Sequence, residues 1–255
     1  MAHSDEARME HDRSAFQAAL LYGRHFFEFW KSDLNRAVVD MAEIQPGMTV
    51  LDIGAGMGAA AFEAVKRDGV TVVTVEPTTF MRTIFKARVA TRRLGPRVAV
   101  LNAAAQRLPV PSGSIDRAWM INVVHHIADL AAASAELARV TKPGGRILIV
   151  DEDFTNESHP KYEQMKNRHQ NHGRHGHGGH GHGAPGDSGP TNAGHRHNPD
   201  QEGHEEEHPT GAEEHPMAID FDALAEHLKA AGFSDIQIRY ASLAGVPTRQ
   251  ATAFK

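Results

Sequence analysis

The chain has 255 residues and a formal net charge of −5, a size typical of one domain or of one domain with an insertion. It contains no cysteine, which excludes disulfides and thiolate metal sites and fits a reducing compartment. Because no run approaches the roughly 20 apolar residues of a membrane span, and because the charged N-terminus lacks the apolar core of a signal peptide, we expect a soluble, cytoplasmic protein.

Residues 1–45 are predicted to form an N-terminal helical cap. Within them, residues 6–43 have helical character and contain the aromatic cluster HFFEFW at 25–30. This cluster is interpreted as core packing, with the alternative that it also lines a substrate pocket.

Residues 46–155 alternate between short apolar runs and stretches with helical spacing. The first run, MTVLDI, ends at glycines, and the helical stretch after it stops at Gly69. Strands are predicted at 48–53, 70–76, 97–101, 115–121 and 145–151, and two further helices at 80–94 and 129–140. Strands that alternate with helices indicate a parallel sheet covered on both faces.

Residues 156–216 form a clear break in composition and are predicted to be a disordered insertion. They contain no Val, Ile, Leu, Phe or Trp, yet hold 12 of the 18 histidines and 11 of the 23 glycines. Such a segment cannot bury enough apolar surface to offset the entropy of ordering its backbone. The other 194 residues balance with 22 basic and 22 acidic side chains. No basic patch that would neutralise phosphates is visible in this composition, so nucleic acid is not an expected partner.

Residues 217–255 return to the pattern of the core and are predicted to complete the same α/β domain. A helix is expected at 221–233, followed by strands at 235–241 and 251–255. With these two, the chain has seven predicted strands.

The turn LDIGAGMGAA at 51–60 lies between a strand and a helix and is the first candidate binding site. Ligands of open α/β sheets bind at the carboxyl ends of strands, near the switch in strand order. The glycines let the backbone turn tightly and approach a ligand, and Glu76, which ends the second strand, can accept both hydroxyls of a ribose. Gly54, Gly56 and Ala59 also satisfy the dinucleotide fingerprint, so a nicotinamide-dependent oxidoreductase is one alternative.

Three further features weigh against that alternative. Asp52 stands two residues before the first glycine, the stretch AAAQRLPVPSGSIDRAWMINVVHHI at 103–127 surrounds the fourth strand, and RVTKPGGRILIVDE at 139–152 leads into the fifth. With these motifs the chain resembles the class I S-adenosylmethionine-dependent methyltransferases, in the broad group that includes the quinone and sterol methylating enzymes. The resemblance covers roughly residues 46–153 and the closing helix and strands. None of its motifs is specific for a substrate.

The resemblance implies a Rossmann-like methyltransferase fold, with a doubly wound, mostly parallel seven-stranded sheet, and a site for S-adenosyl-L-methionine. In this family the glycine turn passes beneath the methionine part of the cofactor, and the acidic residue after the second strand holds the ribose. The implied cofactor-binding residues are Asp52, Gly54, Ala55, Gly56, Gly58, Glu76, Pro77, Met81, Ala105, Gln106 and Asn122.

One position departs from the family pattern. An Asp-Ala-Glu stretch normally contacts the adenine edge, and here it is Ala104-Ala105-Gln106. Without a carboxylate at Ala104, the contact to the adenine amino group is expected from the backbone of Ala105 and Gln106.

Catalysis by this family needs little acid–base chemistry. Methyl transfer from a sulfonium is a direct displacement, so the protein mainly aligns the reactants and removes water. A general base matters only if the nucleophile enters protonated. His125 is then the first candidate, because histidine changes charge near neutral pH; the alternative is that His125 and His126 are hydrogen-bonded structure. Asp151 and Glu152 end the fifth strand at the same rim and are predicted either to orient a substrate or to cap the next segment.

The insertion contains candidate metal ligands. Neutral imidazoles bind Ni, Zn, Co and Cu, and glycines between them let several wrap one ion. The candidate ligands are His172, His175, His177, His180 and His182. Residues 204–208 formally match the zinc protease motif H-E-x-x-H, which we reject because that motif needs a helix buried against a core. The segment is interpreted either as a solvated loop or as a metal-sensing or metal-storing appendage.

The leading prediction is a methyltransferase that acts on a small-molecule acceptor. The alternative is a metal-binding or metal-responsive protein that uses the methyltransferase fold as a scaffold. The acceptor cannot be identified from the sequence, because variable segments build acceptor pockets, and the oligomeric state is likewise not encoded in any motif.

Overall fold

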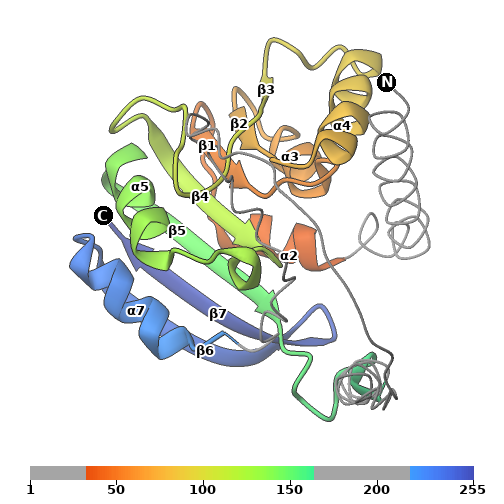
Figure 1. The fold of residues 1–255 in the computed structure, drawn as a ribbon. Helices are drawn as coiled ribbons and strands as arrows, with labels where there is room; N and C mark the ends of the chain where they lie inside the picture. Colours follow the sequence, from red (N-terminus) through yellow and green to blue (C-terminus); the bar gives the residue numbers. More distant parts are fainter. Residues whose placement is uncertain (1–32, 164–218) are drawn as a thin grey trace, which may run out of the picture. The chain divides into compact units, whose positions relative to one another are not determined.

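The structure is a computed structural model, and it describes residues 33–163 and 219–255. Its centre is a seven-stranded sheet with the strand order β3-β2-β1-β4-β5-β7-β6 (Figure 1). The strands are β1 (Thr49–Ile53), β2 (Thr71–Val75), β3 (Val98–Leu101), β4 (Ile115–Ile121), β5 (Thr141–Glu152), β6 (Ser234–Leu243) and β7 (Val246–Phe254). The first five pair in parallel, and β7 pairs antiparallel with both β5 and β6. The predicted doubly wound, mostly parallel sheet is confirmed.

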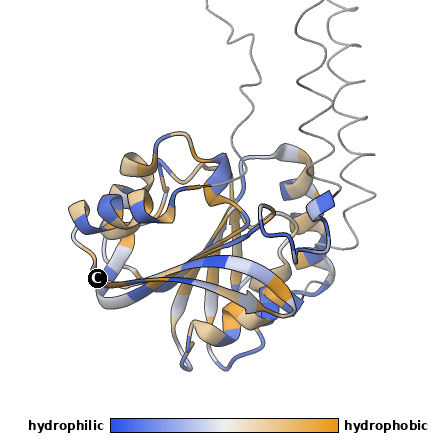
Figure 2. Ribbon diagram, turned by 90° about the horizontal axis from the view of Figure 1, so that it is seen from below, coloured by the Kyte–Doolittle hydropathy of each residue, from blue (hydrophilic) through white to orange (hydrophobic). Residues whose placement is uncertain are grey.

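Helices cover both faces of the sheet, which is why its central strands are apolar on both sides. One core cluster joins the strands to α5 (Leu130–Val140) and α7 (Phe221–Ala230). A second cluster joins them to α2 (Asp33–Met41), α3 (Ala59–Ala64) and α4 (Thr79–Thr91). Neighbouring residues of β1 divide between the two, with Val50 in the second cluster and Leu51 in the first. In Figure 2 the strands in the middle of the sheet are accordingly mostly orange.

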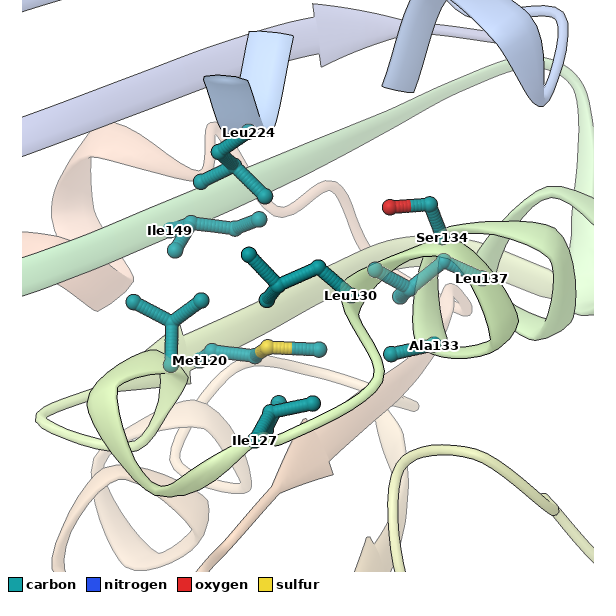
Figure 3. Close-up of a pocket in the computed structure, with 9 residues that line it drawn as sticks. Met120, Ile127, Leu130, Ala133, Ser134, Leu137, Ile149 and Leu224 are labelled. Carbon is teal, nitrogen blue, oxygen red and sulfur yellow. The ribbon is translucent and has the colours of Figure 1, made fainter. Parts of the chain in front are cut away.

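Apolar side chains fill the junction of α5, α7 and the sheet. Figure 3 shows Met120 of β4 and Ile149 of β5 on one side of this junction, with Leu137 of α5 and Leu224 of α7 also lining it. Met120, Leu137, Ile149 and Leu224 are all at most 2% exposed. We therefore assign this junction to the hydrophobic core and not to a ligand site.

Two strands begin four or five residues before their predicted starts. β5 begins at Thr141, because Thr141 pairs with Ile115 before the register shifts to Arg117–Arg146. β7 begins at Val246, because it forms a hairpin with β6 through Ala244 and Gly245, which both have positive φ (53° and 81°). Two central residues with positive φ are typical of the tight turns that match the twist of a hairpin.

Several predictions fall on residues outside the described ranges. They concern residues 1–32, with the aromatic cluster at 25–30, and residues 164–218, which make up most of the insertion. Of the predicted helical cap, the described chain includes α2. No helix within residues 33–163 and 219–255 has the length and apolar character needed to cross a membrane.

Candidate active site

The strand order reverses between β1 and β4, because β2 and β3 follow on one side of β1 and β4 lies on the other. Ligands of open α/β sheets bind in the crevice at such a switch point, outside the carboxyl ends of the strands. Here the turn after β1 and the segment after β4 touch directly. A Cβ added to Gly54 would lie 2.4 Å from Val123 Cγ2, so only glycine fits at this position.

The next two glycines of the turn have different surroundings. Gly58 has a φ of 88°, and an added Cβ would lie 2.1 Å from the Phe85 ring of α4. Gly56 also has positive φ, but there an added Cβ would meet only Met81 Sδ, at 4.0 Å. Gly54 and Gly58 are thus required by packing within the protein, whereas Gly56 leaves an open backbone cradle beside Met81.

Glu76 is fixed against this cradle. Its Oε2 accepts a hydrogen bond from the Gly56 backbone N–H at 2.8 Å, and its Oε1 accepts one from the Thr78 N–H at 2.8 Å. The residue is only 4% exposed. Each carboxylate oxygen has a second lone pair, so Glu76 can still accept the ribose hydroxyls that the sequence motif implies. Arg82 holds the following turn by donating to the carbonyl oxygens of Glu76 and Pro77.

Asp52 is a buried carboxylate two residues before the glycine turn. It is 3% exposed, and its Oδ2 has no hydrogen-bond partner among the described residues. Burial raises the pKa of Asp52 to about 7, and the nearby charge of Glu76 adds to the rise. Interactions of Asp52 with the Trp119 side chain and the Ala61 backbone N–H lower its pKa but do not offset the effect of burial. Because a buried ionised carboxylate is costly when it is incompletely bonded, Asp52 favours a positively charged group nearby. The unpartnered oxygen and the open cradle at Gly56 fit a cationic nucleoside such as S-adenosylmethionine.

The loop after β3 contains the predicted adenine-contacting residues Ala105, which is buried, and Gln106, which is half-buried. Two residues of α5 hold this loop. Glu136 Oε2 accepts from the Leu108 N–H at 2.7 Å, and Arg139 Nη2 donates to the Leu108 carbonyl at 2.8 Å. Sequence reasoning missed this clamp, for which the only local signal was a Glu and an Arg three positions apart on a helix.

The segment after β4 is clamped to the end of β5. Asn122, with a φ of 55°, donates from Nδ2 to Glu152 Oε1 at 2.7 Å, and its Oδ1 accepts from the Glu152 N–H at 2.8 Å. The other oxygen of Glu152 lies 3.0 Å from Nε2 of His159. Both ends of the Asn122 amide therefore bond within the protein, and its assignment to cofactor binding stays a prediction.

His125 and Asp151 form a second pair at this rim. His125 Nδ1 lies 2.6 Å from Asp151 Oδ2, and Asp151 Oδ1 accepts from the Val123 N–H at 3.0 Å. His126 is exposed, and its ring packs 4.0 Å from the His125 ring. The sequence predicted both residues at the same rim but not their contact, which the pairing of β4 with β5 produces.

The histidines predicted to bind metal, His172, His175, His177, His180 and His182, lie outside the described residues. Within residues 33–163 and 219–255, no group of three or more His, Asp or Glu side chains could hold a metal ion.

Comparison with known sequences gives a consistent family. A family model described as "Methyltransferase domain" matches residues 51–149. The chain is 29% identical over 147 residues to the ubiquinone/menaquinone biosynthesis C-methyltransferase UbiE of Shewanella frigidimarina, covering 57% of this chain and 54% of that protein. It is 36% identical over 112 residues to the 2-methyl-6-phytyl-1,4-hydroquinone methyltransferase of Synechocystis, covering 42% and 33%. The chain thus spans about half or less of the length of these relatives.

Comparison with solved structures finds the same arrangement of strands and helices in a methyltransferase. A SAM dependent methyltransferase from Aquifex aeolicus superimposes with a TM-score of 0.55 at 18% identity, covering 88% of this chain and 92% of that one. At this identity the similarity shows the fold alone.

Proposed function

We propose that the chain carries a class I S-adenosylmethionine-dependent methyltransferase domain, as the family model over residues 51–149 and the methyltransferase relatives support, and that the protein transfers a methyl group to a small-molecule acceptor. One observation carries the proposal. The Glu76 carboxylate is held on the Gly56 N–H at 2.8 Å, beside the one position of the glycine turn where the backbone is open. A carboxylate that could accept ribose hydroxyls thus lies next to a backbone without a side chain, which supports the proposal.

Different residues of the rim would contact different parts of the cofactor. Glu76 would accept the ribose hydroxyls, Gly56 would let the backbone approach the cofactor, and Ala105 and Gln106 would meet the adenine through their backbone. The bound cofactor supplies an activated methyl group on a sulfonium. Because the leaving group needs no further activation, the chain itself mainly orients the two reactants and excludes water between them.

We propose a quinone-type acceptor from the names of the relatives, two of which act on quinones or hydroquinones. Methyl transfer to a ring of this kind needs a nucleophilic ring carbon or oxygen close to the cofactor. The rim formed by the segment after β4 and the end of β5 is the adjacent part of the site, and we assign the acceptor to it.

Substitution of Glu76 by Gln tests cofactor binding. We expect Glu76→Gln to weaken the affinity for S-adenosylmethionine and S-adenosylhomocysteine about 10- to 100-fold, since hydrogen bonds to a charged partner contribute roughly 1.5–3 kcal/mol. Isothermal titration calorimetry measures the change. The matched control is Glu63→Gln on α3, whose side chain bonds to Lys66 and not to the glycine turn. A wild-type protein that binds neither nucleoside, or a Glu76→Gln variant that binds both equally well, would contradict the proposal.

A metal-responsive role of the histidine-rich segment is a second candidate, favoured by its 12 histidines among residues 156–216. Imidazoles on a glycine-rich chain bind Ni and Zn without preformed geometry. We expect Zn or Ni to change the turnover of the intact protein but not that of a version lacking residues 160–215. Equal responses of the two proteins would remove this role and leave methyl transfer untouched.

A further inference from the structure

The His125–Asp151 pair is built like the base and orienting carboxylate of an acid–base enzyme. The side chain of Asp151 is 7% exposed and that of His125 is 17% exposed. Besides His125 Nδ1, the carboxylate accepts from the backbone N–H groups of Val123 and His125, at 3.0 and 3.3 Å. Three hydrogen bonds therefore fix its position before any substrate binds.

This geometry determines which ring nitrogen can react. An ionised carboxylate only accepts hydrogen bonds, so Nδ1 of His125 carries the hydrogen of the 2.6 Å bond to Asp151. The lone pair of the neutral ring is then on Nε2. A carboxylate that holds one tautomer of a histidine, so that the other nitrogen can take a proton, is the base–orienter arrangement of nucleophilic catalysis.

The pair lies on the same rim as the open backbone at Gly56. His125 is two residues from Val123, whose methyl group fills the space that a Cβ on Gly54 would need. Asn122 and Glu152 clamp the same segment to β5 through two hydrogen bonds. The segment that carries His125 is consequently fixed where Val123 meets the glycine turn.

A neighbouring pair of the same chemistry has a different role. His159 bonds to Glu152 at 3.0 Å, but its side chain is only 1% exposed and packs edge-on against Phe154 at 4.6 Å. This histidine is sealed within the protein and cannot reach a ligand. Among the titratable side chains around His125, Asp151 from β5 bonds to the ring and His126 packs on it, while Glu152 contacts Asn122 instead.

We propose that His125 and Asp151 form a general-base pair, and that the acceptor carries an ionisable hydroxyl of the phenol or hydroquinone class. This rests on the proposed function. A sulfonium leaves without acid catalysis, so a base contributes only when the nucleophile arrives protonated. An acceptor without an exchangeable proton would gain nothing from an imidazole fixed in one tautomer.

The proposed reaction transfers the methyl group from sulfur to the acceptor and releases one proton. The His125 Nε2 lone pair removes the hydroxyl proton, and the resulting oxyanion attacks the methyl carbon through its oxygen or through a ring carbon that shares its charge. The methyl–sulfur bond breaks, and its electron pair returns to sulfur, leaving neutral S-adenosylhomocysteine. In attack by oxygen, the imidazolium then releases its proton to water. In attack by carbon, the ring loses the proton of that carbon and the ring oxygen takes a proton up again, so this product too is formed with net release of one proton.

The test uses the full chain with methyl-labelled S-adenosylmethionine and 2-methylhydroquinone as the probe, with its dimethyl ether as the matched probe without hydroxyls. Rates are measured between roughly pH 5 and 8, where histidine changes charge. The variants are His125→Ala, Asp151→Asn and the double variant. Asp116→Asn is the control, since this carboxylate at the opposite end of β4 also bonds to a backbone N–H, that of Thr49.

We expect the wild type to methylate the hydroquinone and not its ether, with kcat falling at acidic pH. His125→Ala and Asp151→Asn should lower kcat about 100-fold or more and abolish or shift the acidic limb, while their affinity for S-adenosylmethionine stays within about two-fold. The double variant should be no slower than His125→Ala, because the two residues act as one unit. Asp116→Asn should keep the pH profile of the wild type.

Three results would overturn the base pair: an unchanged kcat and pH profile in His125→Ala, equal methylation of the ether, or cofactor binding with no methylation of the hydroquinone. His125→Ala alone decides the first point if Asp151→Asn does not fold. The proposed function fails separately, when the wild type does not bind S-adenosylmethionine.

Discussion

The two sides of the switch point differ in one buried carboxyl group, that of Asp52. On the cofactor side, Asp52 is 3% exposed and one of its oxygens has no hydrogen-bond partner among the described residues. On the acceptor side, Asp151 bonds to His125 and to backbone N–H groups, and Glu152 bonds to Asn122 and His159. The cofactor side therefore combines the unpartnered oxygen of Asp52 with the Glu76 carboxylate, which bonds to two backbone N–H groups, whereas both oxygens of Asp151 and of Glu152 have partners.

This difference indicates two ways of building a site. A buried carboxyl group with an unpartnered oxygen favours a ligand of positive charge, because the ligand lowers the free-energy cost of ionising that group. A carboxylate paired with a histidine instead fixes the position and tautomer of a reactive side chain. We therefore propose that the side with Asp52 binds the cofactor and that the side with the His125–Asp151 pair carries out the chemistry.

The largest expected effect comes from Asp52→Asn. Because the pKa of Asp52 is raised from 3.8 to about 7 in the folded state, the folded protein binds more protons than the unfolded one between these values. The stability of the wild type should therefore fall as pH rises from about 4 to about 7. Relative to the wild type, Asp52→Asn should gain up to roughly 4 kcal/mol across this window, at about 1.4 kcal/mol per pKa unit.

Urea unfolding of the cofactor-free protein at several pH values measures this gain. If the free energy of unfolding of the wild type and that of Asp52→Asn changed with pH in parallel, the contrast between the two sides would be contradicted. Burial of the Asp52 carboxyl group would then have no net cost.

Gly58→Ala should have the next largest effect. The substitution places an L-residue at a φ of 88° and a Cβ 2.1 Å from the Phe85 ring. We expect a loss of roughly 2–4 kcal/mol in the free energy of unfolding, combining left-handed strain with overpacking. Gly113→Ala is the matched control, because Gly113 also has positive φ but nothing within 4 Å of an added Cβ, and should lose only roughly 1–2 kcal/mol. Equal losses in thermal denaturation would show that the contact with Phe85 contributes nothing.

The smallest expected effect is that of Asn122→Gly on the acceptor side. Glycine accepts the φ of 55° but removes both hydrogen bonds to Glu152. We expect a loss of roughly 1–2 kcal/mol in stability. Because the Asn122 amide is already engaged at both ends, the loss of affinity for S-adenosylmethionine should be smaller than that of Glu76→Gln. If calorimetry showed a loss of affinity for S-adenosylmethionine as large as that of Glu76→Gln, Asn122 would be a cofactor-binding residue.

Sequence patterns predicted most of the fold because its signals are local. The β-branched run of β2 and the period of α5 each fall within one element, and the structure places both within a residue or two of the predicted bounds. The β6–β7 hairpin was only partly predicted, since its turn uses Ala244 and Gly245 and not the Asn-Gly or Asp-Gly pair that signals such turns. Likewise, no local sequence pattern predicted that Thr141 pairs with Ile115 before the register of β4 and β5 shifts.

Local sequence patterns were enough to predict the elements proposed to bind the cofactor, which are three glycines with positive φ and a carboxylate at the end of the next strand. The proposed acceptor side depends instead on the tertiary structure. The parallel register that pairs Ile121 with Val150 brings residues 122–125 beside residues 151 and 152, and from this follow both the His125–Asp151 pair and the Asn122–Glu152 clamp. The conformation of a turn depends on steric limits between neighbouring residues, which can be recognised from a short stretch of sequence. A pair of side chains 26 positions apart depends on how two strands align, which no local pattern specifies.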